Sequence, residues 1–204
     1  GVIASLLPTI FTDYLGVSNV PVNGAIPDTV RYSFYVGGSV YFLAVMWTVL
    51  LSKEDAPADM NVFLAERAAN KGLMNAVKEI LGGFFKMPKT MIQLAVVQFF
   101  SWVALFAMWV YTTPSIASGV FQSTDAQSSA YQEAGNWVGI MFAMYGGVSA
   151  IAAFLLPMLA KVTSRKFVHL LCLVIGGLSL ISIFAVTTKE MLLLPMVGVG
   201  IAWA

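Results

Sequence analysis

The sequence predicts an all-α membrane protein, and three observations lead to this prediction. Of the 204 residues, 59% are hydrophobic and only 10% are charged, with a mean hydropathy of +0.83. A soluble globular domain carries about 25% charged residues, so this chain lacks the polar side chains needed to cover a compact soluble fold. Apolar runs of about 20 residues recur, as bilayer-spanning helices require, without the alternation typical of barrel strands.

The composition also excludes several classes of function. The formal net charge is +1, which gives no electrostatic basis for binding nucleic acid. Cys172 is the single cysteine and His169 the single histidine, so neither an internal disulfide nor a metal-ligand cluster is expected. The sequence contains no P-loop, HExxH or GxSxG motif, and we therefore expect neither an enzyme nor a bound cofactor.

Four uncharged or nearly uncharged runs are long enough to cross a bilayer as helices. In chain order they are Tyr32–Ser52, Met91–Thr113, Asn136–Ala160 and Phe167–Thr188. Two further apolar runs, Gly1–Thr12 and Met191–Ala204, are too short alone and are interpreted as truncated spans. Because the chain lacks an initiator methionine and stops within an apolar run, we expect it to be a piece of a longer protein.

The segment Lys53–Thr90 is the longest polar stretch, and its apolar residues recur at roughly helical spacing. We expect an amphipathic helix there, lying on the cytoplasmic ends of the spans. A solvated linker is the alternative. Either structure divides the chain into an earlier and a later group of spans.

The lysine and arginine distribution predicts the orientation of these spans. Nine of the eleven basic residues fall in two segments, the one after Ser52 and the turn after Ala160. Two spans separate these segments, so both lie on the same side, which the positive-inside rule makes cytoplasmic. The loop Ser115–Gly135 has neither lysine nor arginine and belongs outside.

One face of the second whole span carries polar and aromatic residues. At about 100° per residue a single stripe collects Gln98, Ser101, Trp102, Leu105, Trp109 and Thr112. Such a stripe faces a neighbouring helix or a wet cavity. The two tryptophans lie about 10 Å apart along the axis, too far for one interfacial belt, although packing remains the alternative role. Indole faces stack on sugar rings, and hydroxyl and amide groups bind sugar hydroxyls, so the stripe suits an uncharged polyol.

Pro114 follows this stripe and either ends the helix or bends it at an outer gate. The next span has a small-residue face, which predicts close helix packing and consists of Gly139, Ala143, Gly146, Ala150 and Ala153. Asn136 lies beside that face and is positioned to reach a cavity. Glu133, at the outer boundary, is either an interfacial charge or a candidate for proton coupling.

The turn between the third and fourth spans contains the basic residues Lys161, Arg165 and Lys166. They are candidates for a cytoplasmic gate, because basic groups there can pair with carboxylates or helix C-termini. Positive-inside anchoring alone is the simpler explanation.

The stretches "FFSWVALFAMWVYTTPSIA", "NWVGIMFAMYGGVSAIAAFLLPMLAKVTSRK" and "GIAWA" resemble the sucrose/maltose–proton symporter branch of the major facilitator superfamily, to which the glycoside–cation symporters are related. The resemblance implies a fragment of a twelve-helix fold, from the end of helix five to the start of helix ten. Residues 1–52 would close the N-terminal bundle, 53–90 would form the central cytoplasmic loop, and 91–204 would belong to the C-terminal bundle.

The resemblance further implies alternating access in a multi-pass protein of the cell inner (plasma) membrane, with a neutral sugar bound near the bilayer midplane. The stripe on the second whole span matches a cavity-lining helix of that family, and we expect the sugar to stack on Trp102 or Trp109 and to bind Gln98, Thr112 and Asn136. The superfamily's signature loop has a divergent copy at Pro157–Lys166, in which Lys161 replaces the aspartate.

Two hypotheses follow from the sequence. The first is proton-coupled or sodium-coupled import of a neutral disaccharide or glycoside, with coupling carboxylates in the missing first bundle. The second is a membrane-embedded binding or scaffold protein with no transport cycle.

Overall fold

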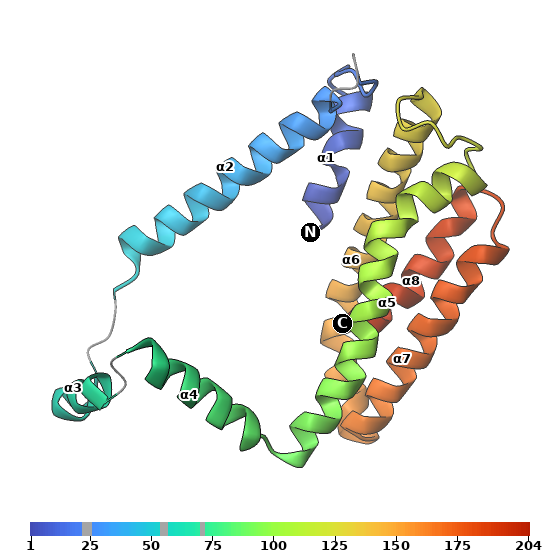
Figure 1. The fold of residues 1–204 in the computed structure, drawn as a ribbon. Coiled ribbons are helices and arrows are strands. Elements are labelled where there is room, and N and C mark those ends of the chain that lie inside the picture. Colours follow the sequence, from blue (N-terminus) through green and yellow to red (C-terminus); the bar gives the residue numbers. More distant parts are fainter. Residues whose placement is uncertain (22–25, 54–56, 70–71) are drawn as a thin grey trace. The chain divides into compact units, whose positions relative to one another are not determined.

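The computed structural model describes residues 1–21, 26–53, 57–69 and 72–204, and within these ranges all regular structure is helical. Figure 1 shows the elements in chain order. They are α1 (Val2–Asp13), α2 (Asp28–Leu51), α3 (Met60–Ala69), α4 (Leu73–Phe85), α5 (Lys89–Gly119), α6 (Ser129–Val162), α7 (Arg165–Ser182), η1 (Ile183–Ala185), η2 (Glu190–Leu192) and α8 (Leu193–Trp203).

Four helical segments of the described chain are long and apolar enough to cross a membrane: α2, α5, α6, and α7 continued through η1. Two shorter apolar helical segments, Val2–Asp13 and Glu190–Trp203, occupy the places of the expected truncated spans. The expectation of an all-α protein with four membrane-length helices is confirmed. Each of the four helices begins before the apolar run that predicts it, and polar caps start two of them, α6 and α7. At the start of α6, for example, the Ser128 hydroxyl accepts a hydrogen bond from the Tyr131 amide at 3.2 Å.

Pro114 lies inside α5, which continues to Gly119. The alternative in which Pro114 ends the helix is therefore wrong. Since proline lacks an amide hydrogen, one intrahelical hydrogen bond is missing at this point. The last turns of α5 bend away from the axis of the preceding turns, as Figure 1 shows.

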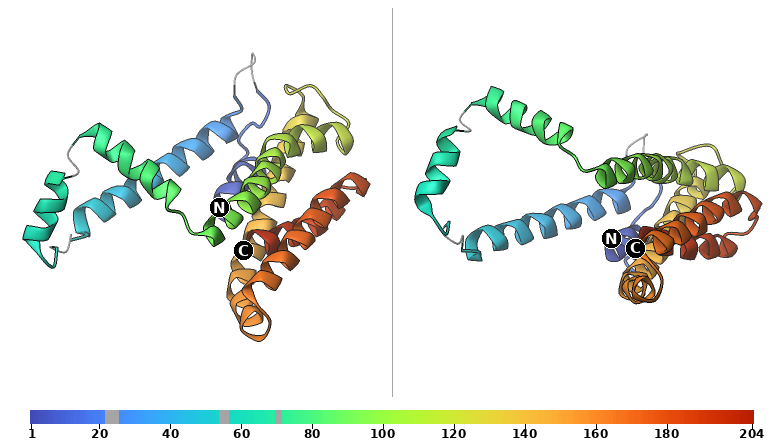
Figure 2. Two further views of the ribbon diagram at one scale, coloured as in Figure 1. Left: turned by 60° about the horizontal axis from the view of Figure 1, so that its bottom comes forward. Right: turned by 90° about the horizontal axis from the view of Figure 1, so that it is seen from below.

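The chain forms two compact units, residues 1–41 with 105–204 and residues 42–104. In the first unit α8 packs between α6 and α7, and α1 packs on α6 (Figure 2). Its core combines residues from α5, α6, η2 and α8. The fully or nearly fully buried members are Met108, Ile116, Val138, Met141, Leu192, Met196 and Val199.

Glycines allow the helices of this unit to approach closely. A methyl group added at Gly139 would lie 2.5 Å from the Ser5 carbonyl oxygen of α1. One added at Gly200 of α8 would lie 2.7 Å from the Tyr145 carbonyl oxygen of α6. Real Cβ atoms do not approach so closely, so only glycine fits both positions. The predicted role of Gly139 in helix packing is confirmed. Ala150 and Ala153, further along the same small-residue face of α6, are exposed.

The second unit contains the end of α2, helices α3 and α4, and the start of α5. The expected amphipathic segment Lys53–Thr90 therefore forms two helices rather than one. Residues 54–56 and 70–71 of that segment lie outside the described residues. The two units cut across α2 and α5, so they do not test the predicted boundaries at residues 52 and 90, which stay predictions.

Candidate functional site

An aromatic cluster joins three helices of the first unit. The indole Nε1 of Trp109 on α5 donates to the Tyr145 hydroxyl of α6 at 3.4 Å. The Trp109 ring also meets the Trp203 ring of α8 edge to face, with the ring centroids 5.7 Å apart. Phe142 packs edge to face on Tyr145 at 5.6 Å. We call Trp109, Phe142, Tyr145 and Trp203 the aromatic cluster.

The aromatic cluster shows which way the outer part of the α5 stripe faces. Trp109 is half-buried and packs against the core, while Trp203 remains 39% exposed. The stripe at Trp109 therefore faces α6 and α8, as expected for a residue between neighbouring helices. Its contact with a sugar stays a prediction.

The hydroxyl groups of the stripe bond to their own helix. Thr112 is buried, and its Oγ1 donates to the Met108 carbonyl oxygen one turn earlier. Ser101 Oγ donates in the same way to the Val97 carbonyl oxygen at 3.0 Å. Such bonds satisfy the hydroxyl donor and leave an oxygen lone pair as the group available to a ligand.

Gln98 and Trp102 lie on the part of α5 that belongs to the second unit. The Gln98 side chain is exposed, and Trp102 is 46% exposed. Both are accessible to a ligand within their unit, and their predicted roles in sugar binding stay predictions.

Asn136 connects α6 to α1. Its Nδ2 donates to Thr12 Oγ1 at 3.2 Å, and its backbone carbonyl accepts from Thr9 Oγ1 at 3.4 Å. Pairs of polar groups between apolar helices satisfy donors that lipid would leave unpaired. In this structure the Asn136 amide therefore serves a helix contact, and its predicted contact with a sugar remains untested.

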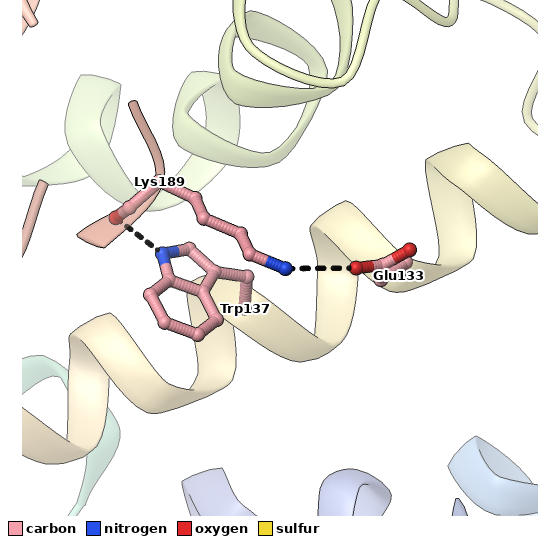
Figure 3. A network of polar contacts seen from close by, with 3 residues as sticks. All are labelled: Glu133, Trp137 and Lys189. Carbon is pink, nitrogen blue, oxygen red and sulfur yellow. Dashed lines mark hydrogen bonds and ion pairs between the residues drawn. The ribbon is translucent and has the colours of Figure 1, made fainter. Parts of the chain in front are cut away.

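Glu133 pairs with a residue far along the chain, Lys189, which lies between η1 and η2 (Figure 3). Lys189 Nζ is 3.2 Å from Glu133 Oε1. The same ammonium lies 5.4 Å from the centroid of the Trp137 ring and 5.8 Å from that of Phe121. The Lys189 carbonyl oxygen accepts from the Trp137 indole at 2.8 Å. Lys189 thus joins the start of α6 to the segment after α5 and to the segment before α8.

This arrangement gives Glu133 a structural role alongside the predicted one. The ion pair with Lys189 ties the start of α6 to the segment before α8, and this structural role alone accounts for the position of the Glu133 side chain. Both side chains are solvent-accessible, with 62% of Glu133 and 39% of Lys189 exposed. The proton-coupling role of Glu133 stays a prediction with this competing explanation.

The predicted cytoplasmic gate residues Lys161, Arg165 and Lys166 are all exposed. Arg165 and His169, one turn apart on α7, line a cavity of about 340 Å³ whose other walls come from α6 and the end of α8. No ion pair involves the three gate residues within the part of the chain that the structure describes. Their side chains are available to partners, which suits both the gate and the anchoring explanation.

The two basic residues outside the two basic-rich segments are both paired with carboxylates. Arg31 lies 3.3 Å from Asp28, and Lys189 lies 3.2 Å from Glu133. Both pairs are partly exposed, and they do not test the predicted orientation, which stays a prediction.

The sequence did not single out Tyr145, Trp203 or Lys189. Tyr145 and Trp203 each lie in apolar runs, where an aromatic residue has no distinctive pattern. Lys189 stood out only as a basic residue outside the rich segments. Among the described residues, no group of three histidine, cysteine, aspartate or glutamate side chains could hold a metal ion.

Comparison of the chain with protein-family models, with curated proteins and with solved structures gives no match.

Proposed function

We propose that this chain is part of a secondary active transporter of the major facilitator superfamily, located in the cell inner (plasma) membrane. It would import a neutral disaccharide or glycoside together with a proton, by alternating access. The proposal rests on the resemblance of the sequence to the sucrose/maltose–proton symporters. The four membrane-length helices are compatible with it.

The observation that best supports a sugar as ligand is the aromatic cluster. It combines flat apolar ring faces with an indole N–H and a phenol hydroxyl, contributed by α5, α6 and α8. Rings of this kind pack on the apolar C–H faces of a sugar, and the polar groups bind its hydroxyls. The cluster contains no charged side chain, which suits a neutral ligand better than an acidic or basic one.

Alternating access requires that a sugar replaces contacts within the protein as it binds. The bond between Trp109 and Tyr145 is long, at 3.4 Å, so a sugar hydroxyl can replace it at little cost. Trp203 already exposes part of its surface. In the proposed mechanism the sugar stacks on Trp109 and contacts Thr112 and Asn136 of the same unit. Gln98 and Trp102, which belong to the second unit, are proposed as sugar-binding residues separately.

Uptake by the twelve-helix protein that the resemblance implies tests this proposal. That protein, in proteoliposomes with an inward proton gradient, should accumulate a labelled disaccharide above the external concentration. A protonophore should abolish the accumulation, whereas replacement of sodium by potassium should leave it unchanged. If sodium is required instead, the coupling ion in the proposal is wrong.

The second candidate is a binding or scaffold protein without a transport cycle. The contacts of Trp109 with Tyr145 and Trp203 favour it, because packing alone can account for them. Saturable sugar binding without uptake would support a binding protein. Absence of both binding and uptake would support a scaffold.

A further inference from the structure

We propose that α4 lies on the cytoplasmic surface of the membrane and binds anionic lipid. This inference concerns the second unit and does not depend on sugar transport. It requires that α5 spans the bilayer. The sequence predicts that the amphipathic segment lies on the ends of the spans. We propose instead that α4 lies on lipid.

The apolar residues of α4 form one continuous face. At 100° per residue its described large apolar side chains fall within an arc of about 140°. They are Met74, Val77, Ile80, Leu81, Phe84 and Phe85, and their exposed fractions range from 42% to 85%. Gly83 lies on the other side of the helix. A face of this width and exposure is typical of a helix that buries its apolar side in the headgroup region.

The connection to α5 fixes where this face can lie. Three residues separate Phe85, the last residue of α4, from Lys89, the first of α5. Figure 1 shows the corner between the two helices. Four Cα–Cα steps join Phe85 to Lys89 and reach at most about 14 Å, so the end of α4 stays within that distance of the end of a membrane-spanning helix. The end of the apolar face nearest α5 is thereby kept close to the membrane surface.

An apolar groove continues from the face into the corner. It has a volume of about 390 Å³ and is lined by Phe84, Met87, Ile92, Ala95, Val96 and Phe99. These residues come from the end of α4, the connection at Met87 and the first turns of α5. The groove offers no polar group for a soluble ligand, whereas an acyl chain suits such a lining.

The charge of the segment identifies the kind of lipid. Residues 71–89 contain four lysines and one glutamate. Of these lysines, Lys78 borders the apolar face, and Lys86 and Lys89 lie at the corner with α5. Lysine stems pack along apolar surface while their ammonium groups reach the headgroups. Anionic phospholipids of the cytoplasmic leaflet are therefore the favoured partners.

The test uses the full chain with one fluorophore on α4. In a Cys172→Ala background, Phe84→Cys places an environment-sensitive label on the apolar face. Gly83→Cys, the adjacent residue on the other side of the helix, is the matched control. Each labelled chain is reconstituted in nanodiscs of phosphatidylcholine with phosphatidylserine, with or without brominated acyl chains.

Brominated lipid should quench the label at residue 84 at least about twofold more than the label at residue 83, because only the former lies in the bilayer. Equal quenching at both positions would overturn the proposal. Protection of residue 84 from both brominated lipid and aqueous iodide would also overturn it, because the face would then pack on protein.

The charge argument has its own test. Lys78→Gln combined with Lys86→Gln should shift the ratio of lipid-bound to free α4 toward the free state, by roughly fivefold for each lysine. Omission of phosphatidylserine should weaken binding of the unmodified helix in the same way. Binding that responds to neither change would overturn the assignment to anionic lipid.

Discussion

Two neighbouring glycines of α7 give the sharpest test of how the first unit packs. A methyl group at Gly176 would lie 2.5 Å from the Ala202 Cβ of α8, whereas one at Gly177 would have no neighbour within 4 Å. We therefore expect Gly176→Ala to destabilise the protein and Gly177→Ala to stabilise it slightly or leave it unchanged.

The magnitude follows from the two distances. Methyl carbons pack at about 3.5–4.0 Å, so Gly176→Ala forces α7 and α8 apart by about 1–1.5 Å. Overpacking of this kind costs about 1–3 kcal/mol. Replacing glycine by alanine inside a helix gains about 0.8–1 kcal/mol in helix propensity, but this gain is common to both variants. The difference between them therefore isolates the packing cost of about 1–3 kcal/mol.

Thermal unfolding of the two variants in the same detergent, followed by circular dichroism, measures this difference. For a chain of this length 1 kcal/mol corresponds to about 2–4 °C, so the midpoint of Gly176→Ala should lie about 2–12 °C below that of Gly177→Ala. Equal midpoints would mean that α7 and α8 do not pack as described. A midpoint for Gly177→Ala below that of Gly176→Ala would mean that Gly177, and not Gly176, faces α8.

Three further predictions concern the polar contacts and the orientation. Asn136→Leu should lower the unfolding free energy by about 0.6–2 kcal/mol, because α1 loses a hydrogen bond to α6; an unchanged denaturation midpoint would count against that contact. A double-mutant cycle with Lys189→Met and Glu133→Gln should give a coupling of at most about 1 kcal/mol, since the pair is exposed, and zero coupling would show that it contributes nothing. In sealed right-side-out vesicles, a membrane-impermeant maleimide should label Gln127→Cys but not Lys161→Cys, and the reverse pattern would invert the proposed orientation.

The helices could be predicted from the sequence because the bilayer imposes a simple length requirement on apolar runs. Each predicted whole span has a counterpart among α2, α5, α6 and α7 with η1. Pro114 was ambiguous, since the same residue ends some helices and bends others. The outcome depended on the five residues after it, which continue the helix.

The contacts between helices could not be predicted in the same way. Glu133 and Lys189 are 56 positions apart, so no local spacing relates them. The stripe on α5 indicates a face toward a neighbouring helix or a wet cavity, but it does not identify Tyr145 and Trp203 as the residues that Trp109 contacts. Which residues meet depends on helix rotation and on close approach at glycines such as Gly200, which a periodicity argument does not determine.

The central claim is tested most directly by the affinity of the proposed twelve-helix protein for a labelled disaccharide, measured at equilibrium for Trp109→Ala and Trp47→Ala. Trp47 is 71% exposed and lies outside the aromatic cluster, so its removal controls for the loss of a tryptophan. We predict that Trp109→Ala raises the Kd by about tenfold or more, equivalent to at least about 1.4 kcal/mol, and that Trp47→Ala leaves it unchanged. An unchanged Kd in a folded Trp109→Ala protein would show that the aromatic cluster is packing alone and would contradict the proposed sugar site.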